Sequence, residues 1–174
     1  LNEETGSYYK GIMYGGFILT KKGVKLLEYN ARFGDPETMN VLPILKTDFA
    51  SICQSIIVQE LHRLKIEFER KATVCKYVVP LGYPDNPLKN EKIEINKASG
   101  KAKMYYASVE EKNKGIYMTG SRAIAFLGIG NNLEEAERIA EEGAESVKGR
   151  VFHRKDIGTK ELIGKRVRHL ELLS

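Results

Sequence analysis

The sequence has few of the residues that would indicate a disulfide-rich, metal-binding or membrane protein. Its two cysteines, Cys53 and Cys75, lie far apart in apolar surroundings and lack the spacing of a disulfide framework or a metal site. The histidines also lack the spacing of a metal site or a catalytic triad; they are His62, His153 and His169. No apolar run reaches the length of a membrane span, and no signal peptide is recognisable. These absences predict a globular protein of a reducing compartment, and we expect a cytoplasmic location.

Charge of one sign does not dominate either, although the balance is basic. A net charge of +5 and a pI near 9.1 would suit a nucleic-acid-binding module. Acidic residues are nevertheless interspersed with the basic ones, as in KNEKIEINKASGKAK from Lys89 to Lys103. This pattern favours a solvated surface of mixed charge, and we expect no nucleic-acid and no membrane partner. A nucleic-acid-binding module and a non-catalytic scaffold stay open as alternatives.

The 174 residues, of which 42% are hydrophobic, suffice for one domain or for one domain and part of another. We predict that the first part contains a β-hairpin, with strands over Tyr9–Thr20 and Val24–Arg32 joined by a turn at Lys21–Gly23. The pair Gly15-Gly16 indicates a bulge or a close backbone approach. Two helices are then predicted, one capped by Asp35 with Pro36 at its first position and Pro43 at its end, and one from Thr47-Asp48 to Leu61.

The second part of the sequence is typical of short strands with one long helix. Asn132, with Glu135 three residues later, is a capping-box arrangement, and we expect the long helix to end at Gly149. Strands are predicted over Ala72–Leu81, Lys92–Ile95, Met104–Val109, Ile116–Thr119 and Ala123–Ile129, and the charged tail after RVFHRKDIG is compatible with a helix. The predicted fold class is α+β, with one domain over residues 1–66 and a second over residues 67–174.

One stretch, LLEYNARFGDPET, places polar side chains on one face of a predicted strand. Glu28, Asn30 and Arg32 alternate along the chain and therefore point to the same side. The opposite side, which we expect to be buried, carries Leu27, Tyr29, Ala31 and Phe33. A carboxylate and an amide oxygen are hard ligands that suit Mg²⁺. Glu28 and Asn30 are therefore candidate ligands of a magnesium ion whose other ligands are ATP phosphate oxygens.

Two residues that follow this pair extend the candidate site. Arg32 would clamp an anionic intermediate or a substrate carboxylate by paired hydrogen bonds. Asp35 would accept a hydrogen bond from an amine or cap the following helix, and these two roles compete for the same oxygens. A simpler alternative is that the polar face is merely the solvent-exposed side of a half-buried strand. Spacing alone leaves that alternative open.

The run LLEYNARFGDPETMNVLP closely resembles the E-[FY]-N-x-R-[FL]-G-D-P-E-[TC] signature of the phosphoribosylamine–glycine ligase family, which belongs to the ATP-grasp superfamily. Further resemblance lies in YKGIMYGGFILTKKG, ATVCKYVVPLGYP, TGSRAIAFLGIGNNLEEAERIA and RVFHRKDIG, and covers essentially the whole chain. The resemblance implies the C-terminal part of an ATP-grasp domain, built of antiparallel strands plus helices. A small, mainly antiparallel C-terminal domain with one long helix is expected to follow it.

This resemblance also implies an activity and a set of site residues. Members of the family use ATP to join glycine to 5-phosphoribosylamine through a glycyl phosphate, in purine biosynthesis. Glu28 and Asn30 fall on the family's Mg²⁺ ligands, where Mn²⁺ is also possible, and thus on its ATP site. Arg32 and Asp35 fall on the turn that faces glycine and the acyl phosphate, where they are candidate catalytic and substrate-binding residues. The ribose phosphate is expected to meet Arg122, Arg154 and Lys155.

The chain departs from the family pattern and lacks part of the site. Met39 stands where the family often has glutamine, and Ser121 stands where glycine is common, which puts backbone access to a phosphate in doubt there. The glycine-rich phosphate loop, the lysines around the adenine and the family's N-terminal domain have no counterpart, and the chain begins without methionine. We therefore expect a C-terminal fragment that is inactive alone and whose partner is the missing N-terminal part. Another ATP-grasp carboxylate–amine ligase is the nearest alternative.

Overall fold

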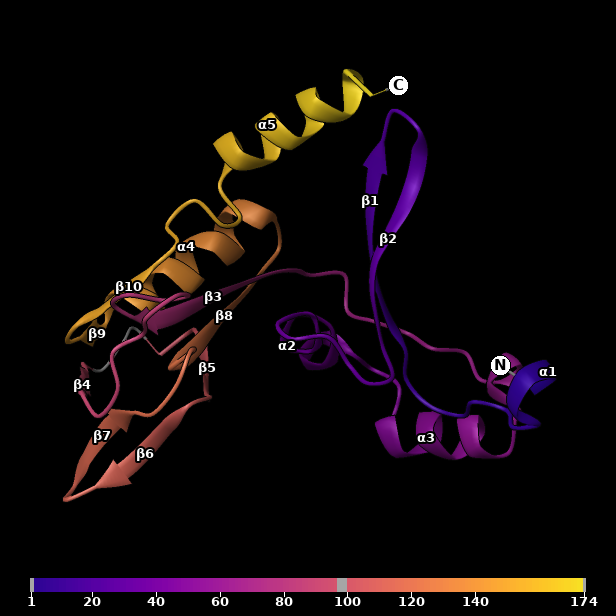
Figure 1. The fold of residues 1–174 in the computed structure, drawn as a ribbon, viewed down its shortest axis with the longest axis horizontal. Helices are drawn as coiled ribbons and strands as arrows, with labels where there is room; N and C mark the ends of the chain where they lie inside the picture. The colour runs from indigo at the N-terminus through magenta and orange to yellow at the C-terminus, as the bar shows by residue number, and fades with distance from the viewer. Residues whose placement is uncertain (1, 97–99, 174) are drawn as a thin grey trace. The chain divides into compact units, whose positions relative to one another are not determined.

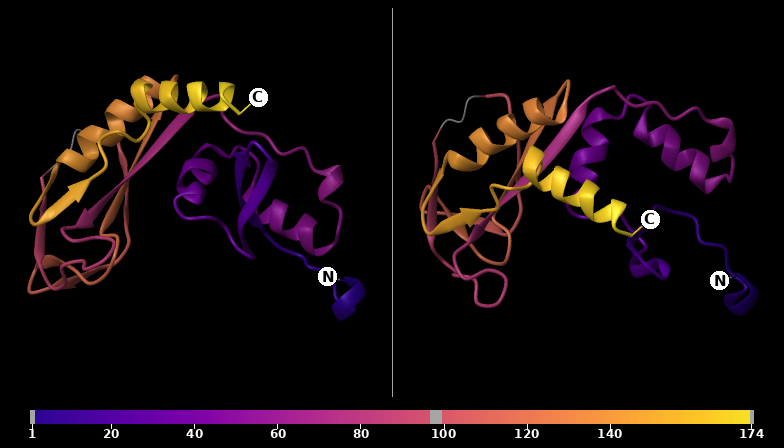
Figure 2. Two further views of the ribbon diagram at one scale, coloured as in Figure 1. Left: turned by 45° about the horizontal axis from the view of Figure 1, so that its top comes forward. Right: turned by 90° about the horizontal axis from the view of Figure 1, so that it is seen from above.

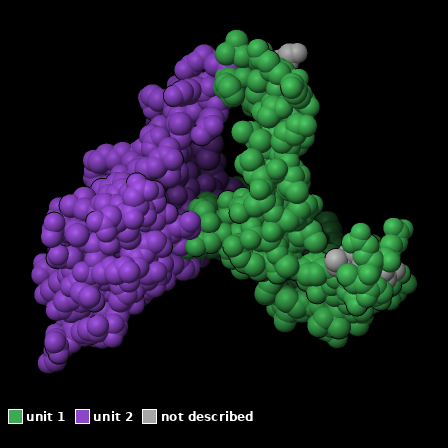
Figure 3. All heavy atoms as spheres, viewed as in Figure 1, with its two compact units in different colours: residues 1–70, 169–174 green, residues 71–168 purple. Residues whose placement is uncertain are grey.

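The structure is a computed structural model that describes residues 2–96 and 100–173, and the chain divides into two compact units (Figure 3). Unit 1 comprises residues 1–70 and 169–174, and unit 2 comprises residues 71–168. The predicted domain boundary at residues 66 and 67 stays a prediction. Over the described part of the chain, no helix combines the length and the apolar character needed to cross a membrane.

Unit 1 contains a β-hairpin and several short helical elements (Figure 1). Strands β1 (Tyr14–Thr20) and β2 (Gly23–Asn30) pair antiparallel, from Thr20 opposite Gly23 at the turn to Tyr14 opposite Asn30 at the other end. The helical elements are α1 (Asn2–Thr5), α2 (Glu37–Val41), η1 (Leu42–Ile44), α3 (Phe49–Ile57) and η2 (Leu61–Arg63).

The hairpin is shorter than the sequence predicts. Strand β1 begins at Tyr14 rather than Tyr9, and β2 ends at Asn30 because it has no partner strand beyond that residue. Arg32 therefore lies outside the strand, and the prediction that the strand extends to Arg32 is wrong. The bulge predicted at the glycine pair is confirmed, since the register of the two strands shifts between Gly16 and Phe17.

The face of β2 that was expected to be buried is exposed. Leu27 is 66% exposed and Tyr29 is 58% exposed, and Ala31 is exposed as well. Phe33 is half-buried, with its ring centroid 5.8 Å from that of Phe49. The physical reason is that β1 and β2 make their tertiary contacts mainly with each other, so no second layer from the described part of the chain covers these apolar side chains.

The sequence predicts the presence of the helices in unit 1 better than it predicts where they begin and end. Asp48 caps α3 as predicted, since its Oδ2 accepts a hydrogen bond of 2.8 Å from the backbone nitrogen of Ser51. That helix ends before Gln59, whose φ of 61° lies in the left-handed region. Pro36 occupies the N-cap of α2 instead of its first helical position, so the predicted Asp35 cap is wrong.

Unit 2 is built from two four-stranded antiparallel sheets, with strand orders β10-β3-β8-β5 and β6-β7-β4-β9. The predicted α+β class with a mainly antiparallel second domain is confirmed. The predicted strand from Met104 to Val109 is in fact two strands in different sheets. The strands are β3 (Ala72–Pro80), β4 (Lys92–Ile95), β5 (Lys103–Tyr106), β6 (Val109–Lys112), β7 (Gly115–Met118), β8 (Ile124–Gly130), β9 (Val147–Lys148) and β10 (Val151–His153).

Helix α4 (Leu133–Glu145) lies across the sheet against β3 and β8 (Figure 2). The approach is closest at Gly128, where an added Cβ would overlap the backbone oxygen of Ala136. Asn132 caps the helix as predicted, by accepting a 2.9 Å hydrogen bond from the backbone nitrogen of Glu135. The helix stops short of Gly149 because the chain pairs into β9 at Val147. The charged tail forms α5 (Lys160–Glu171).

The main hydrophobic core also belongs to unit 2. It consists of apolar side chains from the two sheets and from the C-terminal half of α4, all nearly inaccessible to solvent. These residues are Val78, Ile93, Met118, Ala123, Ile124, Phe126, Ala144 and Val147. Cys75 is buried in the same unit, as expected of a small core residue, whereas Cys53 in unit 1 is half-buried.

Candidate functional site

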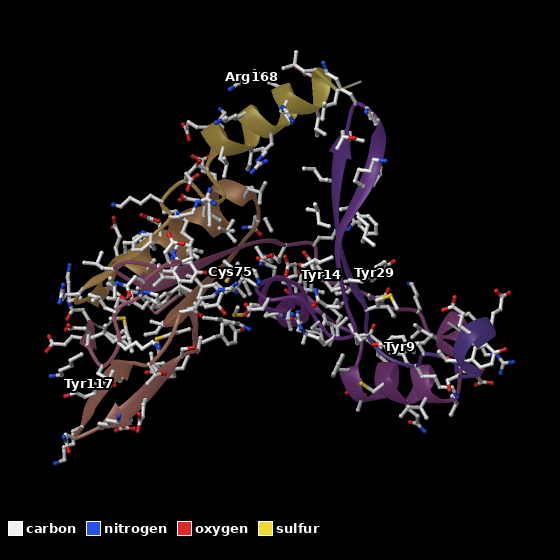
Figure 4. The ribbon with its side chains drawn as sticks, in the orientation of Figure 1. Tyr9, Tyr14, Tyr29, Cys75, Tyr117 and Arg168 are labelled. Carbon is white, nitrogen blue, oxygen red and sulfur yellow. The ribbon has the colours of Figure 1, made fainter. Side chains whose placement is uncertain are left out.

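Four positions share one face of the hairpin next to the end of β2, and we call them the polar face. Tyr14 lies directly opposite Asn30, and Gly16 lies directly opposite Glu28. Residues that face each other across an antiparallel pair project to the same side of the sheet. Tyr29, one residue away, projects to the other side, where its ring meets that of Phe17 edge-on at 6.2 Å. Tyr14 and Tyr29 are labelled in Figure 4.

Glu28 has an open space beside it that depends on a glycine. A Cβ on Gly16 would lie 3.1 Å from Cγ of Glu28, so a larger residue there would press on the carboxylate. A surface hollow of about 600 Å³ runs along this part of the hairpin. Its walls are Tyr14, Gly15, Gly16, Phe17, Leu27 and Glu28. The exposed carboxylate of Glu28 is therefore accessible to a ligand.

Asn30 is the half-buried member of the polar face. Its carboxamide nitrogen is buried and has no hydrogen-bond partner among the described residues. A carboxamide can present either its nitrogen or its oxygen at one position by a half-turn, and the assignment follows from its partners. A buried amide group without a partner is costly, so this position favours a bound group that completes its bonding.

The donor set of the polar face fits a hard divalent cation. Glu28 offers a carboxylate and Asn30 an amide oxygen, which are ligand types that Mg²⁺ and Mn²⁺ accept. Within the described residues, no three His, Cys, Asp or Glu side chains gather into a group that would hold a metal by themselves. Such a cation would therefore take its remaining ligands from water and from substrate oxygens, as Mg²⁺ commonly does with phosphates.

Arg32 and Asp35 lie beyond the strand, in the turn that leads to α2. The Nη1 atom of Arg32 donates a 2.7 Å hydrogen bond to the backbone oxygen of Phe33, and the rest of the guanidinium is exposed. Asp35 is exposed as well. Both side chains are accessible to a ligand, and Arg32 lies outside the strand that was predicted to carry it.

One contact at the site is absent from the sequence prediction. The hydroxyl of Tyr14 donates a 3.1 Å hydrogen bond to Oε1 of Glu37, across 23 residues of sequence. This bond to the Glu37 carboxylate raises the pKa of the Tyr14 hydroxyl; burial and the negative charges of Glu37 and Glu28 raise it further, and Arg32 lowers it. The charges of Glu37, Glu28 and Arg32 thus all act on the Tyr14 hydroxyl. No spacing in the sequence would have indicated this pairing.

The three basic candidates of the C-terminal part lie in unit 2. The guanidinium of Arg122 lies over the ring of Tyr77, 5.2 Å from its centroid. Arg154 forms a two-pronged ion pair with Asp156, and Lys155 donates to Glu145 at 3.0 Å. These ion pairs raise the pKa of both basic groups. Phosphate binding by these three residues stays a prediction, since each already has a partner within the chain.

The sequence patterns also did not predict a buried cluster of charged residues in unit 2. Lys76 on β3 has no exposed surface, and its Nζ donates to Glu137 and to Glu141 on α4, each at 2.6 Å. The same Nζ donates to the backbone oxygen of Lys155 at 2.9 Å, and His153 lies 3.0 Å from Glu141. We call these residues the lysine cluster. It ties β3, α4 and the segment after β10 together.

Comparison with known proteins relates both units to one enzyme family. Residues 73–160 match the family model described as phosphoribosylglycinamide synthetase, C domain, and residues 1–38 match that of its ATP-grasp (A) domain. Phosphoribosylamine–glycine ligase of Methanocaldococcus jannaschii is 56% identical over 176 residues, which cover 99% of this chain and 39% of the relative. The ligase of Methanosarcina acetivorans is 51% identical over 173 residues, which cover 99% of this chain and 39% of the relative.

A solved structure gives the same relationship. The crystal structure of phosphoribosylamine–glycine ligase from Thermotoga maritima superposes with a TM-score of 0.69 at 30% sequence identity. The match covers 88% of this chain and 38% of the solved chain. The chain thus spans about two fifths of the length of the relatives that it matches.

Proposed function

The chain belongs to the phosphoribosylglycinamide synthetase family, and from this premise we propose that it is the C-terminal part of a phosphoribosylamine–glycine ligase. The complete enzyme would use ATP to join glycine to 5-phosphoribosylamine, with ADP and phosphate as by-products and a glycyl phosphate as intermediate. Its place would be purine biosynthesis in the cytoplasm. The observation that carries the proposal is the pair Glu28 and Asn30, two oxygen-bearing side chains on one face beside the space left by Gly16.

The residues of this chain would divide the work as follows. Glu28 and Asn30 would hold Mg²⁺, or Mn²⁺ in its place, together with the phosphates of ATP. When bound, the cation neutralises charge on the phosphate oxygens. Arg32, whose guanidinium is exposed, would bind the carboxylate of glycine or the acyl phosphate, and Asp35 would accept a hydrogen bond from the attacking amine. The phosphate of the amine substrate would be bound by Arg122, Arg154 and Lys155.

The proposal also concerns a partner. Because the chain spans about two fifths of its relatives, the groups that bind adenine and cover the phosphates would belong to the N-terminal part of the same ligase. The 174-residue chain alone is therefore expected to be inactive. Glycine, 5-phosphoribosylamine and ATP would be its small-molecule partners, with no nucleic acid and no membrane involved.

The test compares a double substitution with a single control substitution in the complete ligase. Glu28→Ala with Asn30→Ala should abolish ATP-dependent ligation and weaken Mn²⁺ binding, measured by electron paramagnetic resonance of the free ion. Lys21→Ala is the matched control, because Lys21 is exposed in the turn at the other end of the hairpin. Normal ligation rates in the double variant would disprove the metal assignment and with it the proposed function.

A second candidate stays within the same superfamily. An ATP-grasp ligase that joins another carboxylate to an amine would use the same polar face, because Glu28 and Asn30 would meet the phosphates and not the acid substrate. Assays of the complete ligase with glycine, formate and aspartate separate the two candidates. Activity with formate or aspartate in preference to glycine would favour the second one.

A further inference from the structure

We propose that Tyr14 is a positioning residue, which acts through Glu37 to hold the turn carrying Arg32 and Asp35 in place beside Glu28 and Asn30. The inference rests on the proposed function, since the turn matters only if it faces a substrate. It assigns a role to a tyrosine and a glutamate that the family signature and the spacing of β2 leave without one. The contacts that support it all lie within unit 1.

The first step is that Tyr14 is fixed to the metal-binding strand. It is the first residue of β1 and pairs directly with Asn30, the last residue of β2. Directly opposed side chains in an antiparallel pair have Cβ atoms about 5 Å apart. The ring of Tyr14 is therefore a neighbour of the Asn30 carboxamide on the polar face, and any group held by its hydroxyl is held relative to Asn30.

The second step is that Glu37 is fixed to the turn. Glu37 is the first residue of α2, and the backbone of this helix binds back to the turn, because Thr38 N donates to the oxygen of Gly34 at 3.0 Å. Gly34 is buried, and a Cβ on it would collide with the carboxylate of Glu37 and with the ring of Tyr14. Gly34, Tyr14 and Glu37 are thus packed on one another, and the hydrogen bond closes a loop from β1 to the turn.

The third step concerns charge. Glu37 shares the site with a second carboxylate, Glu28, and with the exposed guanidinium of Arg32. A Glu37 carboxylate without this partner would pair with Arg32. Its hydrogen bond to the neutral Tyr14 hydroxyl occupies one carboxylate oxygen and leaves Arg32 donating to the backbone of Phe33. Tyr14 thereby keeps Arg32 available for its ligand.

The experiment uses the complete ligase with Tyr14→Phe, Glu37→Leu and both together, in comparison with Glu37→Gln, which retains an oxygen that accepts from the hydroxyl. A hydrogen bond to a charged group is strong enough that we expect Tyr14→Phe to lower kcat/KM for glycine about tenfold. Mn²⁺ affinity, measured by electron paramagnetic resonance, should stay unchanged. The double variant should lose no more of its kcat/KM for glycine than either single variant, and Glu37→Gln should retain most of the activity.

The matched control is Tyr29→Phe, which removes the same atom from the opposite face of the hairpin and should leave kinetics and Mn²⁺ affinity unchanged. Glycine kinetics of Tyr14→Phe equal to those of the parent would overturn the inference. So would additive losses of activity in the double variant, or a loss of Mn²⁺ affinity as large as that of the Glu28→Ala, Asn30→Ala variant. If Tyr14→Phe does not fold, Glu37→Leu and Glu37→Gln decide the question alone. Failure of the proposed function would show instead as undiminished ligation in the Glu28→Ala, Asn30→Ala variant.

Discussion

Strands β2 and β8 are similar in length and differ in what surrounds them. Every residue of β2 is exposed except the half-buried Asn30, whereas every residue of β8 is buried except the half-buried Ile129. Strand β8 has a partner on each side and α4 across its face, while among the described residues β2 has one partner strand and no layer packed over it. The burial of a strand therefore depends on whether other elements pack over it, and not on its apolar content. The polar face of β2 is open for ligands because no described element packs over the hairpin.

The largest effect should come from removing an aromatic ring on the buried strand. Phe126, on β8, is 1% exposed and belongs to the core, so Phe126→Ala should lower the free energy of unfolding by about 3–5 kcal/mol. Phe17→Ala on the hairpin is the matched variant, and because that ring is 57% exposed it should cost much less. Denaturant unfolding followed by circular dichroism measures both. Equal losses would contradict the comparison of the two strands.

The next effect should come from the lysine cluster. Lys76→Met preserves volume but leaves the Glu137 and Glu141 carboxylates without their cation, which should destabilise unit 2 by about 3 kcal/mol. Lys92→Met is the control, because Lys92 is exposed and its ion pair with Glu94 is 3.4 Å long, so that its loss should cost under about 1 kcal/mol. The shift in denaturation midpoint distinguishes them. The burial argument fails if the two variants unfold at the same midpoint.

Glycine replacements should have a smaller effect. We expect a loss of stability in unit 2 and a loss of Mn²⁺ affinity in unit 1. In Gly128→Ala the added Cβ would overlap the Ala136 backbone, so we expect a loss of about 2 kcal/mol in unfolding free energy. In Gly16→Ala the added Cβ meets the Glu28 side chain, which can move. That variant should bind Mn²⁺ more weakly in the complete ligase with little change in stability. The reverse outcome, a large loss of stability with normal Mn²⁺ affinity, would contradict it.

The smallest effect is a dependence of stability on pH that originates in unit 2. Burial raises the pKa of Glu141, but hydrogen bonds from Lys76 and His153 outweigh it and hold the pKa below its ordinary value. The unfolded chain therefore binds a proton at this carboxyl more readily than the folded chain does. The ionised Glu141 thus stabilises the folded chain at neutral pH. This stabilisation is lost as the pH falls below about 4, through the folded-state pKa. Glu141→Gln should flatten this acid limb in denaturation midpoints measured from pH 3 to pH 7, whereas Glu134→Gln, on the exposed side of α4, should not.

Local patterns predicted local features well. The cap of α4 at Asn132 and the cap of α3 at Asp48 depend on residues within one helical turn, and the structure confirms both. The bulge at Gly16 is likewise a property of two adjacent residues. Strand and helix ends were less predictable, because they depend on where a partner stops. Strand β2 ends at Asn30 since β1 begins at Tyr14, and α4 ends at Glu145 because the chain pairs into β9 from Val147.

The pairings that shape the candidate sites could not be read from local spacing. Tyr14 and Glu37 are 23 residues apart, and Lys76 is 61 and 65 residues from its two carboxylates. Nothing in the neighbourhood of these residues distinguishes them from ordinary surface or core positions. A fully buried lysine in particular contradicts the usual expectation that lysines are exposed.

The sequence by itself determined the family, the residue types at the candidate cation site and their alternation along β2. These properties depend on the identity and order of neighbouring residues, which can be read directly from the sequence. The tertiary structure decided which apolar faces are covered, where Arg32 lies, and which partners hold Tyr14 and Lys76. These depend on how distant segments pack, and packing is a property of the folded layers and not of any short stretch of sequence.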